Sequence, residues 1–90
     1  METPPVERAR ILGRFKGLME DNFEDLVRSN TREHGKTLVE SRGDVKRGME
    51  VVEFALGVPS LLMGEVLENI ARGIDCEAIR QPLGVCVGIT

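Results

Sequence analysis

The most unusual placement of a reactive side chain in this sequence is that of an arginine, Arg47. Positions 47, 51, 54 and 58 share one helical face, so Arg47 heads an apolar row made of Val51, Phe54 and Val58. An arginine in such a row needs a partner, because an uncompensated buried charge is costly. It can pair with Asp44, extend its head group to water, or present a planar fork to a ligand carboxylate or phosphate. Spacing alone favours the two structural uses, the ion pair or the solvated head group, over ligand binding, because structural pairing is the commoner use of such residues.

The two cysteines and the single histidine do not predict a catalytic centre. His34 precedes Gly35 at an expected helix end, where a histidine cation interacts favourably with the last carbonyls. Cys86 lies in an apolar run and is expected to be a buried, inert thiol, whereas Cys76 lies on a more exposed segment without an activating neighbour. Their spacing is not C-x-x-C, so neither a disulfide framework nor a metal site is predicted.

The last residue, Thr90, is the candidate for a cofactor contact. Gly84 and Gly88 do not form the G-x-G-x-x-G fingerprint of dinucleotide folds. In open α/β sheets, however, ligands gather at the carboxyl ends of strands. Thr90 follows a strand-like run, so it either contacts a cofactor or is the first turn residue after a strand.

Helices are predicted over residues 5–64. Pro5 suits a first helical turn, and the first helix is expected to bury a stripe of Ile11, Phe15 and Leu18 that Leu12 and Met19 widen. A second helix is expected from an N-cap at residue 22 to a glycine C-cap at residue 35.

The third helix, predicted over residues 37–63 with a bend near Gly43, is expected to be buried on two sides. Asp44 is a possible cap for its second half, and Pro59 is expected to reshape its end. One apolar stripe contains Val45, Met49, Val52 and Leu56, and the other contains Val51, Phe54, Ala55 and Val58. Apolar residues on opposite sides are typical of a helix packed between layers.

Strands are predicted after Gly64. Residues 65–82 are expected to form a β-hairpin that turns at Gly73, because apolar and acidic residues alternate from Ile74 onward. Residues 83–90 form an unbroken apolar run, typical of a strand buried on both faces of a parallel sheet. Since parallel strands need a crossover of a dozen or more residues, we expect these 90 residues to be the front part of a larger α/β protein.

Composition excludes several classes of partner. A net charge of −3 without a basic face argues against nucleic acid, and no apolar run approaches the roughly 20 residues of a membrane span. With three Phe and no Trp or Tyr, the core is poor in large side chains and stability is expected to be marginal. The N-terminus lacks the plan of a signal or transit peptide, so a cytoplasmic location is expected.

Five segments, in order, resemble the CoA-acylating methylmalonate-semialdehyde dehydrogenases of the aldehyde dehydrogenase superfamily. They are residues 31–37 (TREHGKT), 43–48 (GDVKRG), 52–55 (VEFA), 60–64 (SLLMG) and 82–89 (PLGVCVGI). The resemblance implies an incomplete Rossmann-like NAD-binding domain over residues 1–90. It also implies that residues 65–82 are a hairpin of the oligomerisation type and that the complete protein is a homo-oligomer.

The same resemblance implies roles for two residues. The arginine of the 43–48 segment, Arg47, would hold the carboxylate of the semialdehyde substrate, so the resemblance favours substrate binding by Arg47 over a structural use. Thr90 would contribute to the NAD site. The implied reaction is NAD- and CoA-dependent oxidation of methylmalonate or malonate semialdehyde to propionyl- or acetyl-CoA, without a metal. Because the family's catalytic cysteine lies downstream, the 90-residue chain is expected to be inactive alone. The alternative is a non-catalytic helical module that pairs with a partner through its hairpin edge.

Overall fold

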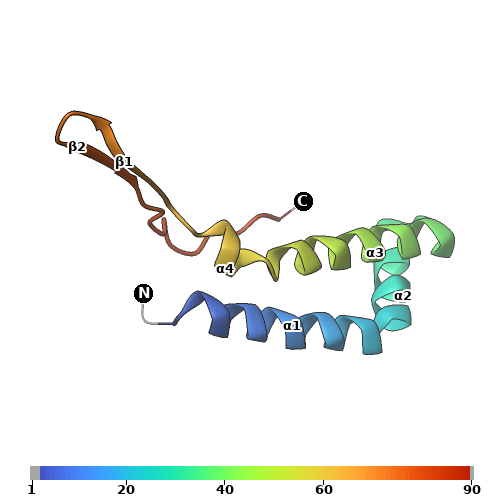
Figure 1. Ribbon diagram of the computed structural model, residues 1–90. Coiled ribbons are helices and arrows are strands. Elements are labelled where there is room, and N and C mark those ends of the chain that lie inside the picture. The colour runs from blue at the N-terminus through green and yellow to red at the C-terminus, as the bar shows by residue number, and fades with distance from the viewer. Residues whose placement is uncertain (1–2, 90) are drawn as a thin grey trace.

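The computed structural model describes residues 3–89 of the chain. Its elements are α1 (Pro5–Asp21), α2 (Phe23–His34), α3 (Leu38–Ala55), α4 (Val58–Leu61), β1 (Glu65–Ala71) and β2 (Ile74–Ala78). Helices α1 and α3 run alongside each other, α2 joins them at one end, and the β1–β2 hairpin projects from the other (Figure 1). The molecule is elongated, with extents of 63 × 23 × 20 Å. The predicted order of helices followed by a hairpin is confirmed.

Helix α1 begins at Pro5, as predicted, but of its predicted apolar stripe only Leu12 and Met19 are half-buried. Ile11, Phe15 and Leu18 remain 52%, 49% and 60% exposed. The side that faces α3 contains Leu12, which is half-buried, and Gly13, where an added Cβ would lie 3.8 Å from Leu56. The apolar surface of α1 is wider than its contacts with α3, α4 and α2 cover, so part of the stripe stays exposed.

Helix α2 is closed at both ends by local hydrogen bonds. Gly35 takes the left-handed conformation (φ 82°) and its N–H donates to the Thr31 carbonyl at 2.9 Å, which confirms the predicted C-cap. Asn22 occupies the N-cap position, but its Nδ2 donates to the Leu18 carbonyl at 2.8 Å instead of capping α2. Its side chain therefore closes the C-terminus of α1.

Helix α3 is continuous through Gly43, so the predicted bend there is wrong. One glycine weakens a helix by only about 1 kcal/mol, which packing offsets. The helical run ends instead at Leu56 and Gly57, whose N–H groups donate to carbonyls three residues back, and α4 begins with Pro59 in its first turn. Two-sided burial is also wrong within residues 3–89, because Val51 and Phe54 are 64% and 72% exposed.

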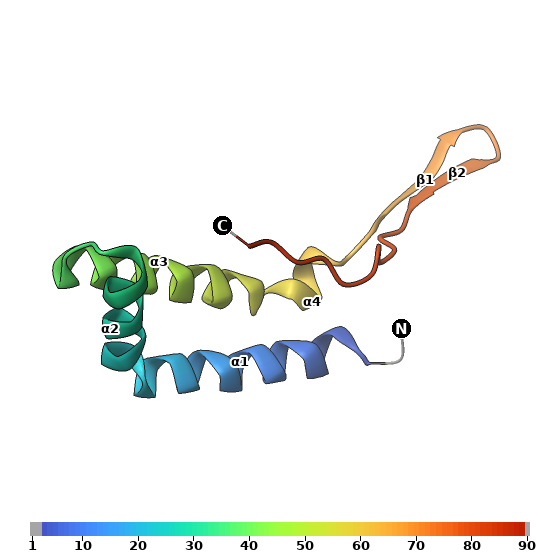
Figure 2. The same cartoon turned by 180° about the vertical axis from the view of Figure 1, so that it is seen from behind.

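Strands β1 and β2 pair in antiparallel register, with Leu67 opposite Cys76 and Ala71 opposite Ile74. Gly73 has a positive φ of 72°, which confirms the predicted turn. Asn69 also has a positive φ (53°) at the irregularity of β1, and its N–H donates to the Asp75 carboxylate at 2.7 Å. Every residue of the hairpin is exposed, since it extends away from the helices (Figure 2).

The strand predicted over residues 83–90 is not formed in the described residues 83–89, and Thr90 lies outside them. Leu83, Val85 and Ile89 are 98%, 94% and 94% exposed. A strand obtains its backbone hydrogen bonds from a neighbouring strand, and no described element offers one to this segment. The prediction that Cys86 is buried is wrong for the same reason.

Candidate functional site

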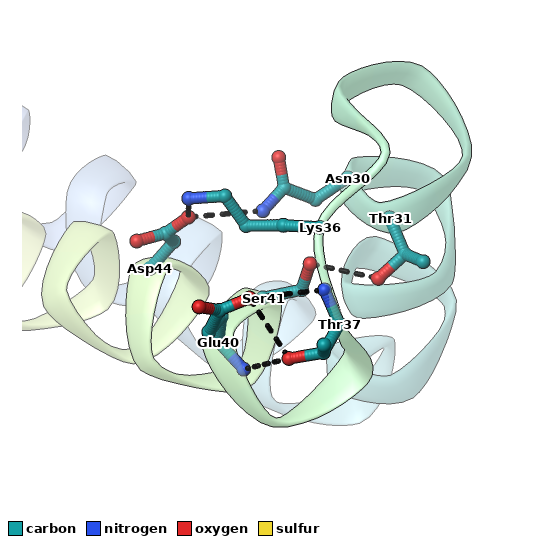
Figure 3. Close-up of polar contacts among 7 residues, drawn as sticks. All are labelled: Asn30, Thr31, Lys36, Thr37, Glu40, Ser41 and Asp44. Atoms are coloured by element: carbon teal, nitrogen blue, oxygen red, sulfur yellow. Dashed lines mark hydrogen bonds and ion pairs between the residues drawn. The ribbon is translucent and has the colours of Figure 1, made fainter.

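A group of hydrogen-bonded polar side chains lies at the corner where α2 turns into α3, and we call it the α2–α3 corner. Figure 3 shows its side chains, which come from the end of α2, the connecting loop and the first two turns of α3. They are Asn30, Thr31, Lys36, Thr37, Glu40, Ser41 and Asp44. The corner sets the direction of α3, the helix that carries Arg47.

A capping box starts α3. Thr37 Oγ1 accepts a hydrogen bond from the Glu40 N–H at 3.3 Å, and Glu40 Oε2 accepts one from the Thr37 N–H at 3.1 Å. Two N–H groups that would otherwise lack partners at the helix start are thus satisfied. The hydrogen bonds from Thr37 hold the pKa of Glu40 below its usual range.

Asp44 joins the first two turns of α3 to the connecting loop and to α2 through hydrogen bonds. Its Oδ2 accepts hydrogen bonds from Lys36 Nζ and, at 3.3 Å, from Asn30 Nδ2. The bond from Lys36, followed by that from Asn30, lowers the pKa of Asp44. Asp44 therefore neither caps a second helix nor pairs with Arg47.

The corner also contains a buried hydroxyl pair. Ser41 on α3 is fully buried, and its Oγ accepts a hydrogen bond of 2.7 Å from Thr31 Oγ1 on α2. A buried hydroxyl without a partner costs free energy, so this pair favours one rotation of α3 against α2.

A fork-to-fork ion pair next to the corner joins α2 and α3 a second time. Arg42 donates from Nε to Glu24 Oε1 at 3.1 Å and from a terminal nitrogen to Oε2 at 3.2 Å. The Arg42 guanidinium lowers the pKa of Glu24. Although the pair is solvated, its two parallel bonds fix geometry more firmly than a single contact does.

Arg47 lies one turn beyond this fixed segment and is exposed. Among residues 3–89 it has no hydrogen bond or ion pair, so of the uses that its spacing allowed the pair with Asp44 is not formed and the head group extends to water. Its helical face continues through Val51 and Phe54, both exposed. The arrangement presents a free guanidinium beside an apolar surface, and such a group can bind a carboxylate through two parallel hydrogen bonds.

The other predicted residues are not brought to Arg47. His34 is exposed in the last turn of α2, as predicted, and both cysteines are exposed and free. Thr90 lies outside the described residues. Within residues 3–89 no group of three or more His, Cys, Asp and Glu side chains is placed to hold a metal ion, and no helix has the length and apolar character of a membrane span.

Sequence reasoning missed most of the α2–α3 corner. Thr37 and Glu40 have the S/T-x-x-E spacing of a capping box, so this element was readable from the sequence. The Lys36–Asp44 and Thr31–Ser41 contacts were not, because they depend on how the loop folds back.

The family assignment follows from comparison with known proteins. The family model described as "Aldehyde dehydrogenase family" matches residues 1–90 of this chain. This chain belongs to the aldehyde dehydrogenase family.

Within the family, the chain is similar in sequence to semialdehyde dehydrogenases. It is 48% identical over 87 residues to the mitochondrial methylmalonate-semialdehyde dehydrogenase [acylating] of Arabidopsis thaliana, covering 97% of this chain and 14% of that protein. It is also 48% identical to malonate-semialdehyde dehydrogenase 1 of Geobacillus kaustophilus, covering 99% of this chain and 18% of that protein. The resemblance inferred from the sequence is confirmed.

Solved structures agree. A Sinorhizobium meliloti protein assigned as a methylmalonate-semialdehyde dehydrogenase, solved with NAD, matches with a TM-score of 0.82 at 45% identity, over 91% of this chain and 17% of that chain. The methylmalonate-semialdehyde dehydrogenase of Oceanimonas doudoroffii matches with a TM-score of 0.74 at 44% identity, over 82% of this chain and 15% of that chain. The chain thus has the fold of a part of aldehyde dehydrogenases, and spans less than a fifth of these relatives.

The described residues do not by themselves fit a dinucleotide. A dinucleotide site needs a crevice at the ends of a parallel sheet and a helix start facing the phosphates. Residues 3–89 contain one two-stranded antiparallel sheet, and the glycine fingerprint is absent from the sequence. No step of hydride transfer is therefore assigned to them.

Proposed function

We propose that this chain is a part of an NAD-dependent, CoA-acylating methylmalonate- or malonate-semialdehyde dehydrogenase, which converts the semialdehyde, NAD and CoA to propionyl- or acetyl-CoA, NADH and CO2. The observation that carries the proposal is the 48% identity to the Arabidopsis enzyme over 97% of this chain. By the same resemblance, the complete enzyme is a homo-oligomer and Thr90 contributes to its NAD site.

In this proposal Arg47 binds the carboxylate that distinguishes a semialdehyde acid from a simple aldehyde. Its exposure and its lack of a partner among residues 3–89 leave all its donors available. The α2–α3 corner supports this role, because it fixes the start of the helix that carries Arg47. An exposed guanidinium that must meet a small carboxylate gains from a rigid support.

The test places residues 1–90 in the Sinorhizobium meliloti protein in place of its matching segment. Arg47→Gln should lower kcat/KM for methylmalonate semialdehyde about 10- to 100-fold, the loss of a charge-assisted hydrogen bond. The same substitution should leave kcat/KM for propionaldehyde, which lacks the carboxylate, nearly unchanged. Lys46→Gln, an equal change of charge at an exposed neighbour, is the control. Equal losses in kcat/KM for both aldehydes would show that Arg47 does not bind the substrate carboxylate.

We further propose that the 90-residue chain alone is inactive. Among residues 3–89, neither Cys76 nor Cys86 has a hydrogen-bond or ion-pair partner that would stabilise a thiolate nucleophile. An assay of the purified chain with NAD, CoA and methylmalonate semialdehyde should show no turnover above the buffer rate. Measurable turnover that a Cys76→Ser variant abolishes would contradict this proposal.

A second candidate function is a non-catalytic module that pairs with another chain through the edge of the hairpin. The observation in its favour is the exposure of every residue of β1 and β2, which leaves two strand edges accessible. Size-exclusion chromatography of the chain, alone and mixed with the complete Oceanimonas doudoroffii enzyme, separates the two ideas. Co-elution supports the module, and a chain that ignores the enzyme argues against it.

A further inference from the structure

A cavity separate from Arg47 lies where the start of α1 meets α4 and the segment after β2. In both cartoon views the N-terminal end of α1 lies beside α4 and this segment (Figures 1 and 2). The cavity measures about 310 Å³, within the range of small-ligand sites. Its lining consists of Thr3, Pro4, Pro5, Arg8, Leu62, Arg80 and Pro82.

The charged side chains that line this cavity, among residues 3–89, are two arginines. Arg8 comes from the first turn of α1 and Arg80 from the segment after β2, and among residues 3–89 no Asp or Glu lines the cavity. Glu7, the acidic residue in the first turn of α1, is exposed and does not line it. Two guanidinium groups that share a cavity repel each other unless an anion lies with them.

The hydrogen-bond donors of the two arginines are also unequally satisfied. Arg8 Nε is buried and has no partner within residues 3–89, and such a donor costs free energy. Arg80 Nε donates to the Met63 carbonyl at 3.4 Å, a long bond that orients the guanidinium. The terminal nitrogens of Arg80 have no hydrogen bond or ion pair within the same residues.

The remaining lining favours an anion as well. Pro4, Pro5, Leu62 and Pro82 form apolar walls, and an apolar surrounding strengthens the attraction between opposite charges. The cavity also lies at the positive end of the 17-residue helix α1, which adds a favourable field for negative charge. Thr3 supplies a hydroxyl donor at the rim.

From these observations we propose that Arg8 and Arg80 form a binding site for a small oxyanion, a phosphate or a carboxylate group. The anion accepts hydrogen bonds from the guanidinium of Arg8 and bridges it to the fork of Arg80. Arginine suits this role because its planar donors match two oxygens of one anionic group. Arg47 does not line this cavity.

The experiment titrates the ¹⁵N-labelled chain with inorganic phosphate or, separately, with acetate, at constant ionic strength, and follows each arginine Nε–H signal by NMR. The signals of Arg8 and Arg80 should shift and saturate, whereas that of Arg14, exposed on the same helix, should not. Tighter binding of phosphate identifies a phosphate site, and tighter binding of acetate a carboxylate site. Shifts that are equal for all arginines and never saturate would overturn the proposal.

The anion affinities of arginine variants test whether Arg8 and Arg80 form the site. Arg8→Gln and Arg80→Gln should each weaken binding at least about tenfold, and Arg14→Gln, the same change of charge, should not. Arg8→Lys keeps the charge but loses the fork, so it should also bind less tightly. Circular dichroism confirms that each variant is folded, and the titration of the unmodified chain decides the question if one is not. Unchanged affinity in folded Arg8→Gln would refute the site.

Discussion

Breaking the hydroxyl pair inside the α2–α3 corner tests whether it orients the two helices. Ser41→Ala removes the acceptor of the 2.7 Å bond from Thr31, at a side chain that is fully buried. The lost bond and the unpaired Thr31 hydroxyl together lower the free energy of unfolding by about 1–2 kcal/mol. The better helix propensity of alanine raises it by about 0.5 kcal/mol. The expected net loss in the free energy of unfolding is therefore about 1 kcal/mol.

The assay is urea unfolding followed by circular dichroism at 222 nm. The control is Ser29→Ala, because Ser29 is exposed on α2 and its side chain has no hydrogen bond among residues 3–89. It should be neutral or stabilise the chain by up to about 0.5 kcal/mol, the gain in helix propensity alone.

A double-mutant cycle isolates the pair itself. Thr31→Val should destabilise the chain by at least as much as Ser41→Ala, because it leaves the fully buried partner without its donor. The double variant should cost less than the sum of the two, with a coupling near 1 kcal/mol. Additivity within about 0.4 kcal/mol would show that the contact does not stabilise the corner.

Three further predictions concern neighbouring residues. Thr37→Ala removes the capping box and should lower the free energy of unfolding by about 1 kcal/mol, measured by urea titration, and an unchanged midpoint would contradict the cap. Gly35→Ala has space for its Cβ but must keep a φ of 82°, so it should cost about 1 kcal/mol, and a neutral result would show that the loop relaxes. Because the folded state lowers the pKa of Asp44, its contribution is present above the ordinary value of 3.8 and is lost as pH falls below it. Unfolding curves from pH 6 to pH 2 should therefore show a smaller loss of stability in Asp44→Asn than in the original chain, and parallel losses would exclude Asp44 as a contributor.

Features set by neighbouring residues in the sequence were predictable. The left-handed glycines at 35 and 73 follow from local backbone preference, and α1 starts at a proline because proline suits a first turn. The capping box at Thr37 belongs to the same class, although it was not recognised.

Features that depend on distant parts of the chain were not predictable in the same way. Which face of α1 is buried depends on where α3 lies, and so does the exposure of Phe15. The apolar run after Pro82 has the composition of a buried strand, but composition supplies no neighbouring strand to accept its hydrogen bonds. Arg47 shows the same limit, because Asp44 is close in sequence yet is already bonded to Lys36.

The short sequence spans inside the α2–α3 corner have a kinetic consequence. Its bonds join residues between three (Thr37 and Glu40) and fourteen (Asn30 and Asp44) positions apart. Chains rich in such near-neighbour bonds lose little loop entropy and fold quickly. Helices α2 and α3 can therefore pack against each other early in folding, before the hairpin packs. Segments that fold later then pack against a helix pair that is already formed.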